Sequence, residues 1–577
     1  MAYSLPDEKG NITQLNSGDT LGDLYSSFGI SLKDGKIKVS NPQKVYFDTV
    51  SETSFTTKIL GAVRFGTNKM LVLSNKIYYF TLGSFFNYTY VPAGSNLPSP
   101  SAYDTGVYFD GKILVSDTDD IHSSTDGATW ALWWTGTLGQ SALSSAVSDQ
   151  QPRLMKVGGT GNLYISDSGN KIYYVDRAGS SVVKTGNGTL DFSETNHRFT
   201  CMEPTSTRMW IGTKNIGGKA AVIEWDMSVS ASTANKIHDI GAEAVRAIVI
   251  YHDTPIAILS NGKFKIFDGL RFVDMKGVEI RIPRGYKLAE DFMHRNGWDT
   301  MDGLPHILIN GKLEGQASDY AAASISEWAM PSGVYAIDPE KGLYHKYSLP
   351  TGDVSRDDYA QVSATKTGAL IAVDIEETKF LSSYETMETD STYRATLAYE
   401  DAANTYDTKA WIATSHKLAL RQEDKLTELF HKPLEAGCSI NLYQRSENNN
   451  PTVLKGTWAD TDTFNTVVTG TGIEKGNIAL IKMGSGAGQW VKIKEVTESS
   501  TVTSITLETT NSFVTAGDDG TIEVFDFKFM GTIDDTTRDY HSFAFPVTDK
   551  KRKRQVLFEI TQAAGTEVEI DYIVVNP

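Results

Sequence analysis

The stretch Met209-Trp-Ile-Gly-Thr213, followed by a turn and then by Ala221-Val-Ile-Glu-Trp225, is a clear example of a unit that recurs along the chain. Each half is a short run rich in apolar, β-branched and aromatic residues, which is typical of a buried strand. The turn between them contains Gly217 and Gly218, and glycine is frequent where two strands reverse direction. The unit therefore predicts two short strands joined by a turn.

Six further stretches have the same form, and they lie at 70–80, 112–130, 162–175, 256–267, 306–337 and 369–381. The units start roughly 40 to 60 residues apart, close to the period of β-propeller blades. A four-stranded blade buries both faces only when neighbours stack on it, whereas separate sandwiches would need about 100 residues each. We therefore predict an all-β protein with a propeller of about seven blades over residues 45–387, with six or eight blades as alternatives.

One turn carries a more specific pattern, Ser124-Thr-Asp-Gly-Ala-Thr-Trp130. It resembles the Asp-box of sialidase-like propellers, one residue shorter than the usual spacing. In that family the Asp accepts backbone hydrogen bonds and the Trp packs into the blade. The resemblance implies a structural hairpin turn built from Ser124, Asp126, Gly127 and Trp130.

The N-terminal segment, residues 1–44, is rich in glycine and has only scattered apolar positions. Such a segment has too little apolar surface to fold alone, so it is either a disordered tail or an arm ordered against something else. The aromatic residues Tyr25 and Phe28 favour an arm. Together with Ile30 they are candidate contacts with a neighbouring subunit.

The sequence pattern changes after about residue 388, where the predicted strands become longer and apolar residues alternate with polar ones. Alternation with a period of two is typical of a half-buried sheet, so residues 388–449 and 521–577 predict a β-sandwich. Residues 450–520 predict a small inserted β-barrel. Helical periodicity is scarce, and the best helical candidates are Tyr286–Arg295 and Tyr320–Trp328.

The composition limits the functions that the chain could have. The 577 residues include 54 Lys and Arg and 71 Asp and Glu, which gives a formal net charge of −17. A general nucleic-acid binder is disfavoured because phosphate binding needs clustered Lys and Arg, although DNA could still pass by. The N-terminus has no signal-peptide pattern and no run is long enough to span a membrane, so we expect synthesis in a cytoplasm and no membrane insertion.

The sequence offers no recognisable catalytic or cofactor constellation. Its two cysteines, Cys201 and Cys438, are too few for a disulfide framework or a metal cluster, and both are expected to be buried thiols. The glycine run 484–488 precedes a strand rather than a helix, so a plain turn is favoured over a phosphate-binding loop. Acidic pairs such as Asp518 and Asp519 are expected to be solvated turns. We predict no enzyme, no cofactor and no metal.

The densest positive patch is Lys550-Lys551-Arg552-Lys553-Arg554. Only Gln555 separates it from the strand at 556–560. Lysines protect sheet edges from unwanted pairing, so we expect these side chains to lie along an edge or at a subunit contact, with nucleic-acid binding as the lesser alternative.

The chain as a whole resembles bacteriophage virion proteins of the tail or neck, in which an N-terminal arm and a β-propeller are joined to C-terminal β modules. The local matches are at 411–415, 425–431, 433–437, 476–489 and 492–496. The propeller-bearing tail nozzle of short-tailed phages is the nearest functional analogue. The resemblance implies a structural tail protein that forms a homo-oligomeric ring, with a hexamer favoured by analogy, beside other tail or neck proteins and with DNA only in transit.

A rival from another class is a carbohydrate-binding or carbohydrate-active tail propeller. The 10 tryptophans and 26 tyrosines could supply surfaces on which sugars stack, although the packing of blades also needs aromatic residues.

Overall fold

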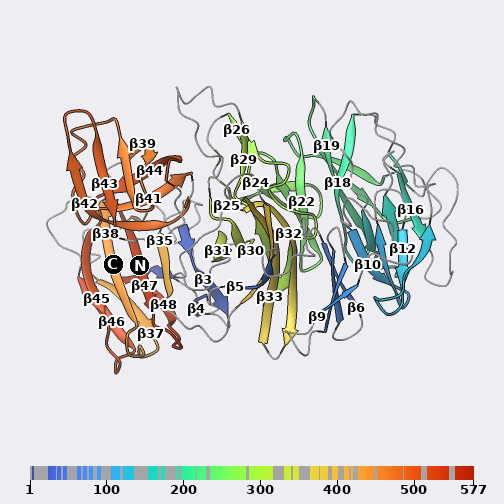
Figure 1. Ribbon diagram of the computed structural model, residues 1–577, viewed down its shortest axis with the longest axis horizontal. Helices are drawn as coiled ribbons and strands as arrows, with labels where there is room; N and C mark the ends of the chain where they lie inside the picture. Colours follow the sequence, from blue (N-terminus) through green and yellow to red (C-terminus); the bar gives the residue numbers. More distant parts are fainter. Residues whose placement is uncertain are drawn as a thin grey trace.

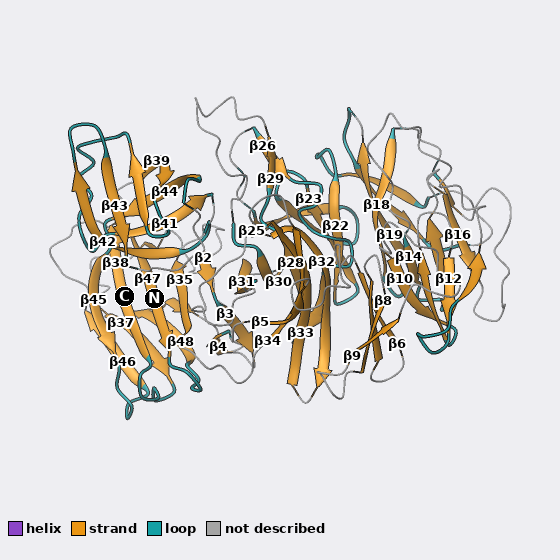
Figure 2. Cartoon of the chain, viewed as in Figure 1, coloured by secondary structure: helices purple, strands orange, loops and turns teal. Residues whose placement is uncertain are grey.

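The computed structural model shows that the chain is all-β, because every element among its described residues is a strand (Figure 2). The prediction of an all-β fold is therefore confirmed. The described residues are 3–5, 24–33, 36–40, 43–48, 61–65, 69–73, 77–81, 88–91, 105–116, 121–134, 154–166, 171–175, 190–192, 196–215, 217–228, 234–280, 282, 285–315, 330–339, 342–349, 364–375, 377–387, 393–400, 408–414, 418–419, 426–446, 451–484, 486–508, 516–544 and 553–576.

Seven of the sheets are four-stranded and antiparallel. Their strands, sheet by sheet, are β6 (Gly61–Phe65), β7 (Lys69–Leu73), β8 (Ile77–Thr81) and β9 (Tyr88–Val91); β10 (Thr105–Phe109), β11 (Lys112–Ser116), β12 (Ile121–Ser124) and β13 (Ala131–Trp134); β14 (Met155–Val157), β15 (Leu163–Ser166), β16 (Lys171–Val175) and β17 (Leu190–Asp191); β18 (His197–Pro204), β19 (Met209–Asn215), β20 (Ala221–Trp225) and β21 (Lys236–Asp239); β22 (Val245–Tyr251), β23 (Thr254–Leu259), β24 (Lys263–Phe267) and β25 (Phe272–Glu279); β27 (Trp298–Met301), β28 (Leu304–Ile309), β30 (Gly333–Asp338) and β31 (Gly342–Ser348); β32 (Ala364–Ile375), β33 (Glu377–Met387), β34 (Tyr393–Glu400) and β5 (Gln43–Asp48).

These sheets form a closed, propeller-like ring. The first strands of successive sheets touch in the order β6, β10, β14, β18 and β22; β22 contacts β28, β27 and β28 contact β32, and β32 returns to β6. The last sheet is completed by β5, which pairs with β34 from Gln43↔Glu400 to Asp48↔Thr396. The predicted boundaries at 44/45 and 387/388 are therefore wrong, because this sheet takes in all of β5 and β34.

The region predicted as a helix at Tyr286–Arg295 begins instead with the short strand β26 (Tyr286–Leu288). This strand pairs with β29 (Leu313–Gly315), and turns follow it up to β27. A partner that is distant in sequence overrides the weak helical pattern here. The second predicted helix, Tyr320–Trp328, lies outside the described residues.

The N-terminal strands and the C-terminal half of the chain together make two six-stranded sheets. The first contains β3 (Ile30–Lys33), β4 (Lys36–Val39), β48 (Glu569–Asn576), β37 (Leu426–His431) and β46 (Tyr540–Ala544), with β1 (Tyr3–Leu5) also paired to β48. The second contains β2 (Leu24–Phe28), β35 (Thr408–Thr414), β47 (Lys553–Gln562), β38 (Ser439–Ser446) and β45 (Lys528–Ile533), with β36 (Leu418–Ala419) also paired to β47. The first and last strands of the described chain, β1 and β48, pair with each other at the end of the molecule that the six-stranded sheets form (Figure 1).

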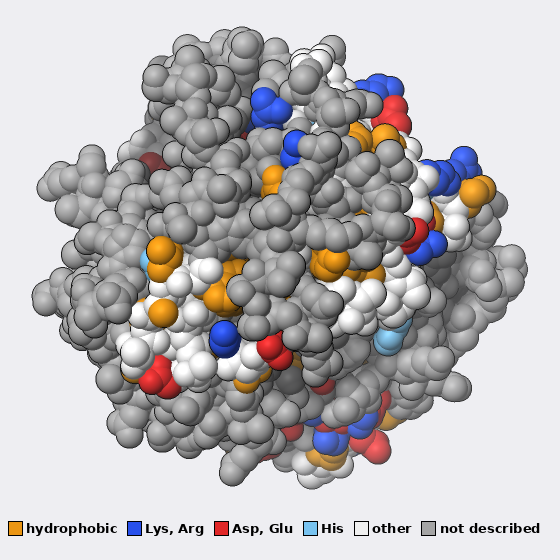
Figure 3. Space-filling view, turned by 90° about the vertical axis from the view of Figure 1, so that its right-hand side faces the viewer, with side chains coloured by type: hydrophobic (Ala, Val, Ile, Leu, Met, Phe, Trp, Pro, Cys, Tyr) orange, Lys and Arg blue, Asp and Glu red, His pale blue; other side chains and the backbone are white. Residues whose placement is uncertain are grey.

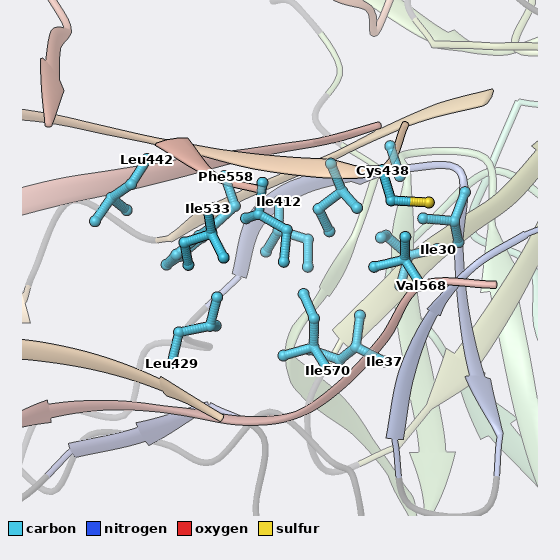
Figure 4. Packing of buried hydrophobic residues seen from close by; sticks show 14 of the residues in the cluster. Ile30, Ile37, Ile412, Leu429, Cys438, Leu442, Ile533, Phe558, Val568 and Ile570 are labelled. Carbon is cyan, nitrogen blue, oxygen red and sulfur yellow. The ribbon is translucent and has the colours of Figure 1, made fainter. Parts of the chain in front are cut away.

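The two six-stranded sheets share one apolar core. Alternate residues of each strand point inward, as the period-two pattern requires, and residues from both sheets point toward one another (Figure 4). The labelled members are Ile30, Ile37, Ile412, Leu429, Cys438, Leu442, Ile533, Phe558, Val568 and Ile570.

A closed six-stranded barrel lies within the sequence of these sheets. The barrel packs on both neighbouring parts of the molecule. Trp490 and Phe525 share a cluster with Trp411 of the six-stranded sheets, and Met483 joins the core that includes Tyr335 of the ring. The predicted boundary at 520 is wrong, because β44 pairs with β39 and β41 as far as Phe525. In order around the barrel, the strands are β39 (Thr452–Trp458), β40 (Thr463–Thr466), β43 (Thr503–Leu507), β42 (Trp490–Glu498), β41 (Ile478–Met483) and β44 (Asp519–Phe525).

Candidate functional site

The Asp-box-like turn between β12 and β13 has the hydrogen bonds that its resemblance implies. Asp126 Oδ1 accepts hydrogen bonds from the N–H groups of Ala128 and Thr129, both at 2.8 Å. Ser124 Oγ accepts from the N–H of Gly127, also at 2.8 Å, and Gly127 has a positive φ of 81°. These contacts hold the pKa of Asp126 at about 2, because the two backbone N–H groups stabilise the carboxylate.

Trp130 completes the turn and anchors it. Its side chain is only 4% exposed, and its Nε1 donates to the Gly127 carbonyl at 3.2 Å. Each of the four residues thus serves the local hairpin. The turn is a structural device and offers no group for chemistry.

Two of the three predicted subunit contacts in the N-terminal segment are instead buried within their own chain. Phe28 is 5% exposed and packs with Trp411 and Trp490, while Ile30 is 2% exposed in the core between the six-stranded sheets. The prediction is therefore wrong for Phe28 and Ile30, because β2 and β3 complete the sheets of the same chain. Tyr25 lies in β2, and its side chain is outside the described part.

The basic run does not lie along a sheet edge where the structure describes it. Lys553 and Arg554 begin β47, which pairs with β38 on one side and with β35 and β36 on the other. Arg554 has a partner on each side, Ser446 and Leu418. The prediction of an edge is wrong for these two residues, whereas Lys550, Lys551 and Arg552 lie outside the described residues.

His345 of β31 forms the junction between the ring and the N-terminal segment. Its ring stacks on Phe28 with centroids 4.5 Å apart, and its Nδ1 accepts a hydrogen bond from the N–H of Gly29 at 3.0 Å. Accepting at Nδ1 requires a neutral imidazole with its proton on Nε2, which faces Ser348 Oγ at 3.2 Å. Burial lowers the pKa of His345 to about 3, so this neutral form persists at ordinary pH.

A polar cluster lies at the centre of the ring of sheets, and we call Lys156, Glu203 and Trp298 the axial cluster. Glu203 Oε1 lies 2.7 Å from Lys156 Nζ and accepts a hydrogen bond from Trp298 Nε1 at 3.1 Å. The three residues come from β14, β18 and β27, and β27 is not adjacent to either of the other two around the ring. Their side chains therefore meet across the middle of the ring.

The axial cluster is electrostatically unusual because its ion pair includes a carboxylate that is almost fully buried. Burial raises the pKa of Glu203, although Lys156 and Trp298 oppose this shift. Burial also lowers the pKa of His294 well below its usual value, and the charges of Arg295 and Lys156 act in the same direction. Perturbed groups of this kind gather at functional sites more often than elsewhere.

Solvent still reaches this cluster. The Lys156 side chain is 27% exposed, and His294, Arg295 and Trp298 are partly exposed, whereas the Glu203 side chain is 5% exposed. A sequence reading misses this group because its members lie on separate strands and fit no motif. The strands themselves give no signal, because β18 and β27 each contain several polar residues and nothing local distinguishes Glu203 or Trp298 from their neighbours.

The described ranges contain neither a metal-binding cluster of side chains nor a helix that could cross a membrane. Within them, no group of three or more His, Cys, Asp and Glu side chains is arranged to hold a metal ion. Equally, the described part of the chain contains no helix long and apolar enough to cross a membrane.

Comparison with known proteins gives likenesses in fold only. No protein-family model and no curated protein sequence matches the chain. Solved structures similar to it include the Pan2 WD40 domain of Neurospora crassa (8% identity, TM-score 0.36, 63% of this chain and 96% of that one). Others are BamB from Moraxella catarrhalis (10%, 0.33, 68% and 96%) and the N-terminal domain of Nup159 (10%, 0.35, 66% and 98%). Likenesses at these TM-scores carry no argument about function.

Proposed function

We propose that this chain is a structural protein of a phage tail, of the nozzle, hub or adaptor kind, and that copies of it form a ring around the DNA exit channel. Its seven four-stranded sheets would be the blades of one β-propeller, and its two six-stranded sheets a sandwich with the barrel inserted. A hexamer is favoured by analogy with tail nozzles. Other tail or neck proteins would be its neighbours, the virion tail its location, and the host cytoplasm its place of synthesis.

The observation that carries this proposal is the anchoring of the N-terminal segment. β5 closes the last four-stranded sheet, while β2, β3 and β4 complete both six-stranded sheets. The last sheet of the ring joins β5, near the N-terminus, to β34, which lies about 350 residues later in the chain. This pairing keeps the first and last sheets of the ring from separating. A subunit that stays in place while DNA leaves a particle needs such a closed body.

The charge and the centre of the ring fit the same proposal. A net charge of −17 per chain disfavours retention of phosphates by the channel wall. Lys156, Glu203 and Trp298 meet across the middle of the sheet ring. The proposed channel therefore runs between subunits and not through the ring of sheets in one subunit.

Electron microscopy of the purified full chain tests the proposal. The proposal expects closed rings with a central opening, each containing several copies. Particles that all have the size of one chain, at every concentration and in assembled phage particles as well, would contradict it.

The second candidate function is carbohydrate recognition. A sugar can stack only on an aromatic ring that solvent reaches, so the exposure of the tryptophan side chains limits the possible binding sites. Among the tryptophans whose side chains are described, Trp133 and Trp298 are partly exposed, whereas the others are buried: Trp130, Trp210, Trp225, Trp411, Trp458 and Trp490. Trp298 lies beside charged groups that could hydrogen-bond a sugar. Glycan-array binding that Trp298→Ala abolishes would favour this candidate over a purely structural role.

A further inference from the structure

We propose that the stacked imidazoles of His431 and His541 are a pH-sensitive latch, which holds the edge strand β46 on β37 while both rings are neutral and releases that strand in acid. The inference goes beyond the proposed function and holds whether or not copies of the chain form a ring. Its basis is the geometry of the two rings, the charged groups around them and the place of β46 in its sheet.

The two imidazoles face each other across neighbouring strands. His431 ends β37 and His541 lies in β46, with ring centroids 5.3 Å apart and planes 12° from parallel. Both Nε2 atoms are buried and have no hydrogen-bond partner among the described residues. His431 Nδ1 donates to the carbonyl of Lys432 at 2.5 Å, so the neutral ring keeps its proton on Nδ1 and leaves Nε2 bare.

A proton added to either ring would create a donor that the pair cannot satisfy. A charged imidazole donates from both nitrogens, so Nε2 would carry an N–H into a buried position where no described group accepts it. Its charge would also lie against the second imidazole. At the opposite end of the molecule from the six-stranded sheets, by contrast, histidine atoms reach the surface, where water can accept such a hydrogen bond (Figure 3).

The charges around His541 have a net effect against the charged form. Burial lowers the pKa of His541, and the charges of His431 and Arg538 act in the same direction. The carboxylates of Asp535 and Asp534 oppose this shift without cancelling it. The neutral pair is therefore the form that the attached strand favours.

Two carboxylates on the elements around the pair already have other partners. Asp535, in the turn before β46, accepts hydrogen bonds from the N–H and the hydroxyl of Thr537 at 2.8 and 2.7 Å. Glu569, on the neighbouring strand β48, pairs with Lys432 at 2.7 Å. The ammonium of Lys432 directly follows His431 in the chain and adds a positive charge on that side.

The strand β46 is the element whose attachment depends on the pair. It is the last strand of its sheet, and among the described residues it pairs only with β37, from Leu426↔Ala544 to Phe430↔Tyr540. Once β46 is released, His541 regains its usual pKa of 6.5, so the released strand binds a proton more readily than the attached one. Attachment is therefore strongest above pH 6.5 and weakens as the pH falls below it. Release uncovers backbone groups of β37 to which another strand could pair.

Hydrogen exchange of the full chain, followed by mass spectrometry at about pH 7.5 and about pH 5, tests the latch on either side of the usual histidine pKa. Protection factors corrected for the intrinsic effect of pH should fall about threefold or more at residues 540–544, and less at 556–560 in β47. His541→Phe keeps a ring against His431 but takes up no proton, so it should lose most of this pH dependence. His345→Phe, which removes a buried histidine of the ring of sheets, should keep it.

Three results would overturn the proposal. The first is equal protection of residues 540–544 at the two pH values, and the second is a fall that 556–560 share in full. The third is a His541→Phe variant that is protected at about pH 7.5 and still loses protection in acid as the wild type does. If His541→Phe is unprotected at both pH values, His541→Gln, which is also uncharged, takes its place in the comparison. None of these results bears on whether the chain forms rings.

Discussion

His345 Nδ1 accepts a hydrogen bond from the backbone N–H of Gly29, at 3.0 Å, although 316 residues separate the two positions in the chain. The contact joins a strand of the propeller-like ring to the turn between β2 and β3. It also fixes the tautomer of a buried histidine. Because the N-terminal segment belongs to both parts of the molecule, we expect this junction to matter for the stability of the whole chain.

Replacing His345 tests the junction directly. His345→Phe keeps an aromatic ring against Phe28 but leaves the Gly29 N–H without an acceptor, so we expect a loss of about 1–3 kcal/mol in the free energy of unfolding. Urea denaturation measures it. Ser348→Ala removes only the contact at Nε2 and should cost less. Equal stability of His345→Phe and the wild type would show that the hydrogen bond contributes nothing.

The same histidine makes stability depend on pH. Its pKa in the folded chain, about 3, lies below the usual value of 6.5, so the unfolded chain binds a proton that the folded chain does not. The contribution is fully present above pH 6.5 and is lost as the pH falls from 6.5 toward 3. Between these values, each unit by which the pH falls should reduce the contribution of His345 to the free energy of unfolding by about 1.4 kcal/mol.

Denaturation at several pH values compares the wild type with His345→Phe. The free energy of unfolding should depend less steeply on pH in the variant, by the amount that His345 contributes. The dependence that remains comes from other buried histidines, such as His306, whose pKa is also lowered by burial. An unchanged slope would mean that the pKa of His345 is not lowered in the folded chain, so that the folded and unfolded chains bind its proton over the same pH range.

Glu569 of β48 holds the N-terminal segment in place through Lys36 and Lys38 of β4, and it also pairs with Lys432, which directly follows β37. Burial acts to raise the pKa of Glu569, but hydrogen bonds from Lys36, Lys432 and Lys38 outweigh this effect and lower it to about 2. The Glu569 side chain is 3% exposed. Glu569→Gln should therefore destabilise the chain by about 3 kcal/mol, since it breaks a buried ion pair.

Thermal unfolding of Glu569→Gln beside Glu567→Gln provides the matched comparison. Glu567 pairs with Lys38 at 2.6 Å but its side chain is 55% exposed, so its removal should change stability little. The effect of Glu569→Gln should shrink as the pH falls from 4.5 toward 2, because the wild-type carboxylate then becomes protonated. Similar effects of the two variants would contradict this account.

Gly488 lets the barrel approach the ring of sheets closely. A Cβ atom added there would lie 2.1 Å from Pro331 Cδ, and the residue has a φ of +90°. Gly488→Ala should thus suffer both backbone strain and a steric clash. Gly476→Ala, at a φ of +89° with no atom within 4 Å of its added Cβ, suffers only the strain.

The difference between the two glycine variants isolates the contact with the ring. We expect Gly488→Ala to lose about 1 kcal/mol more than the roughly 1 kcal/mol lost by Gly476→Ala, and to become more sensitive to limited proteolysis. Equal losses in urea denaturation would place the barrel away from Pro331 in solution.

The short strands could be predicted from the sequence because they are local. The apolar runs at 209–213 and 221–225 appear in β19 and β20, and the turn after β12 contains the residues that its pattern names. In each case the partner strand or the hydrogen-bond acceptor lies a few residues away. Alternation and turn residues are then enough.

Pairings between distant parts of the chain could not be predicted in this way. Nothing local in β5 shows that it closes a sheet with β34, and nothing in β47 shows that its basic start lies between two partners. The axial cluster joins Glu203 to a tryptophan 95 residues away. Such contacts follow from the order of the sheets around the ring, which a single sequence does not specify.

The mass of the full-length protein in solution is the most direct test of the central claim, that copies of this chain assemble into a ring. Native mass spectrometry over a range of concentrations should give one closed species whose mass is a fixed multiple of the chain mass, with six copies favoured. A single-chain mass at every concentration, or a ladder of sizes with no closed species, would contradict the claim.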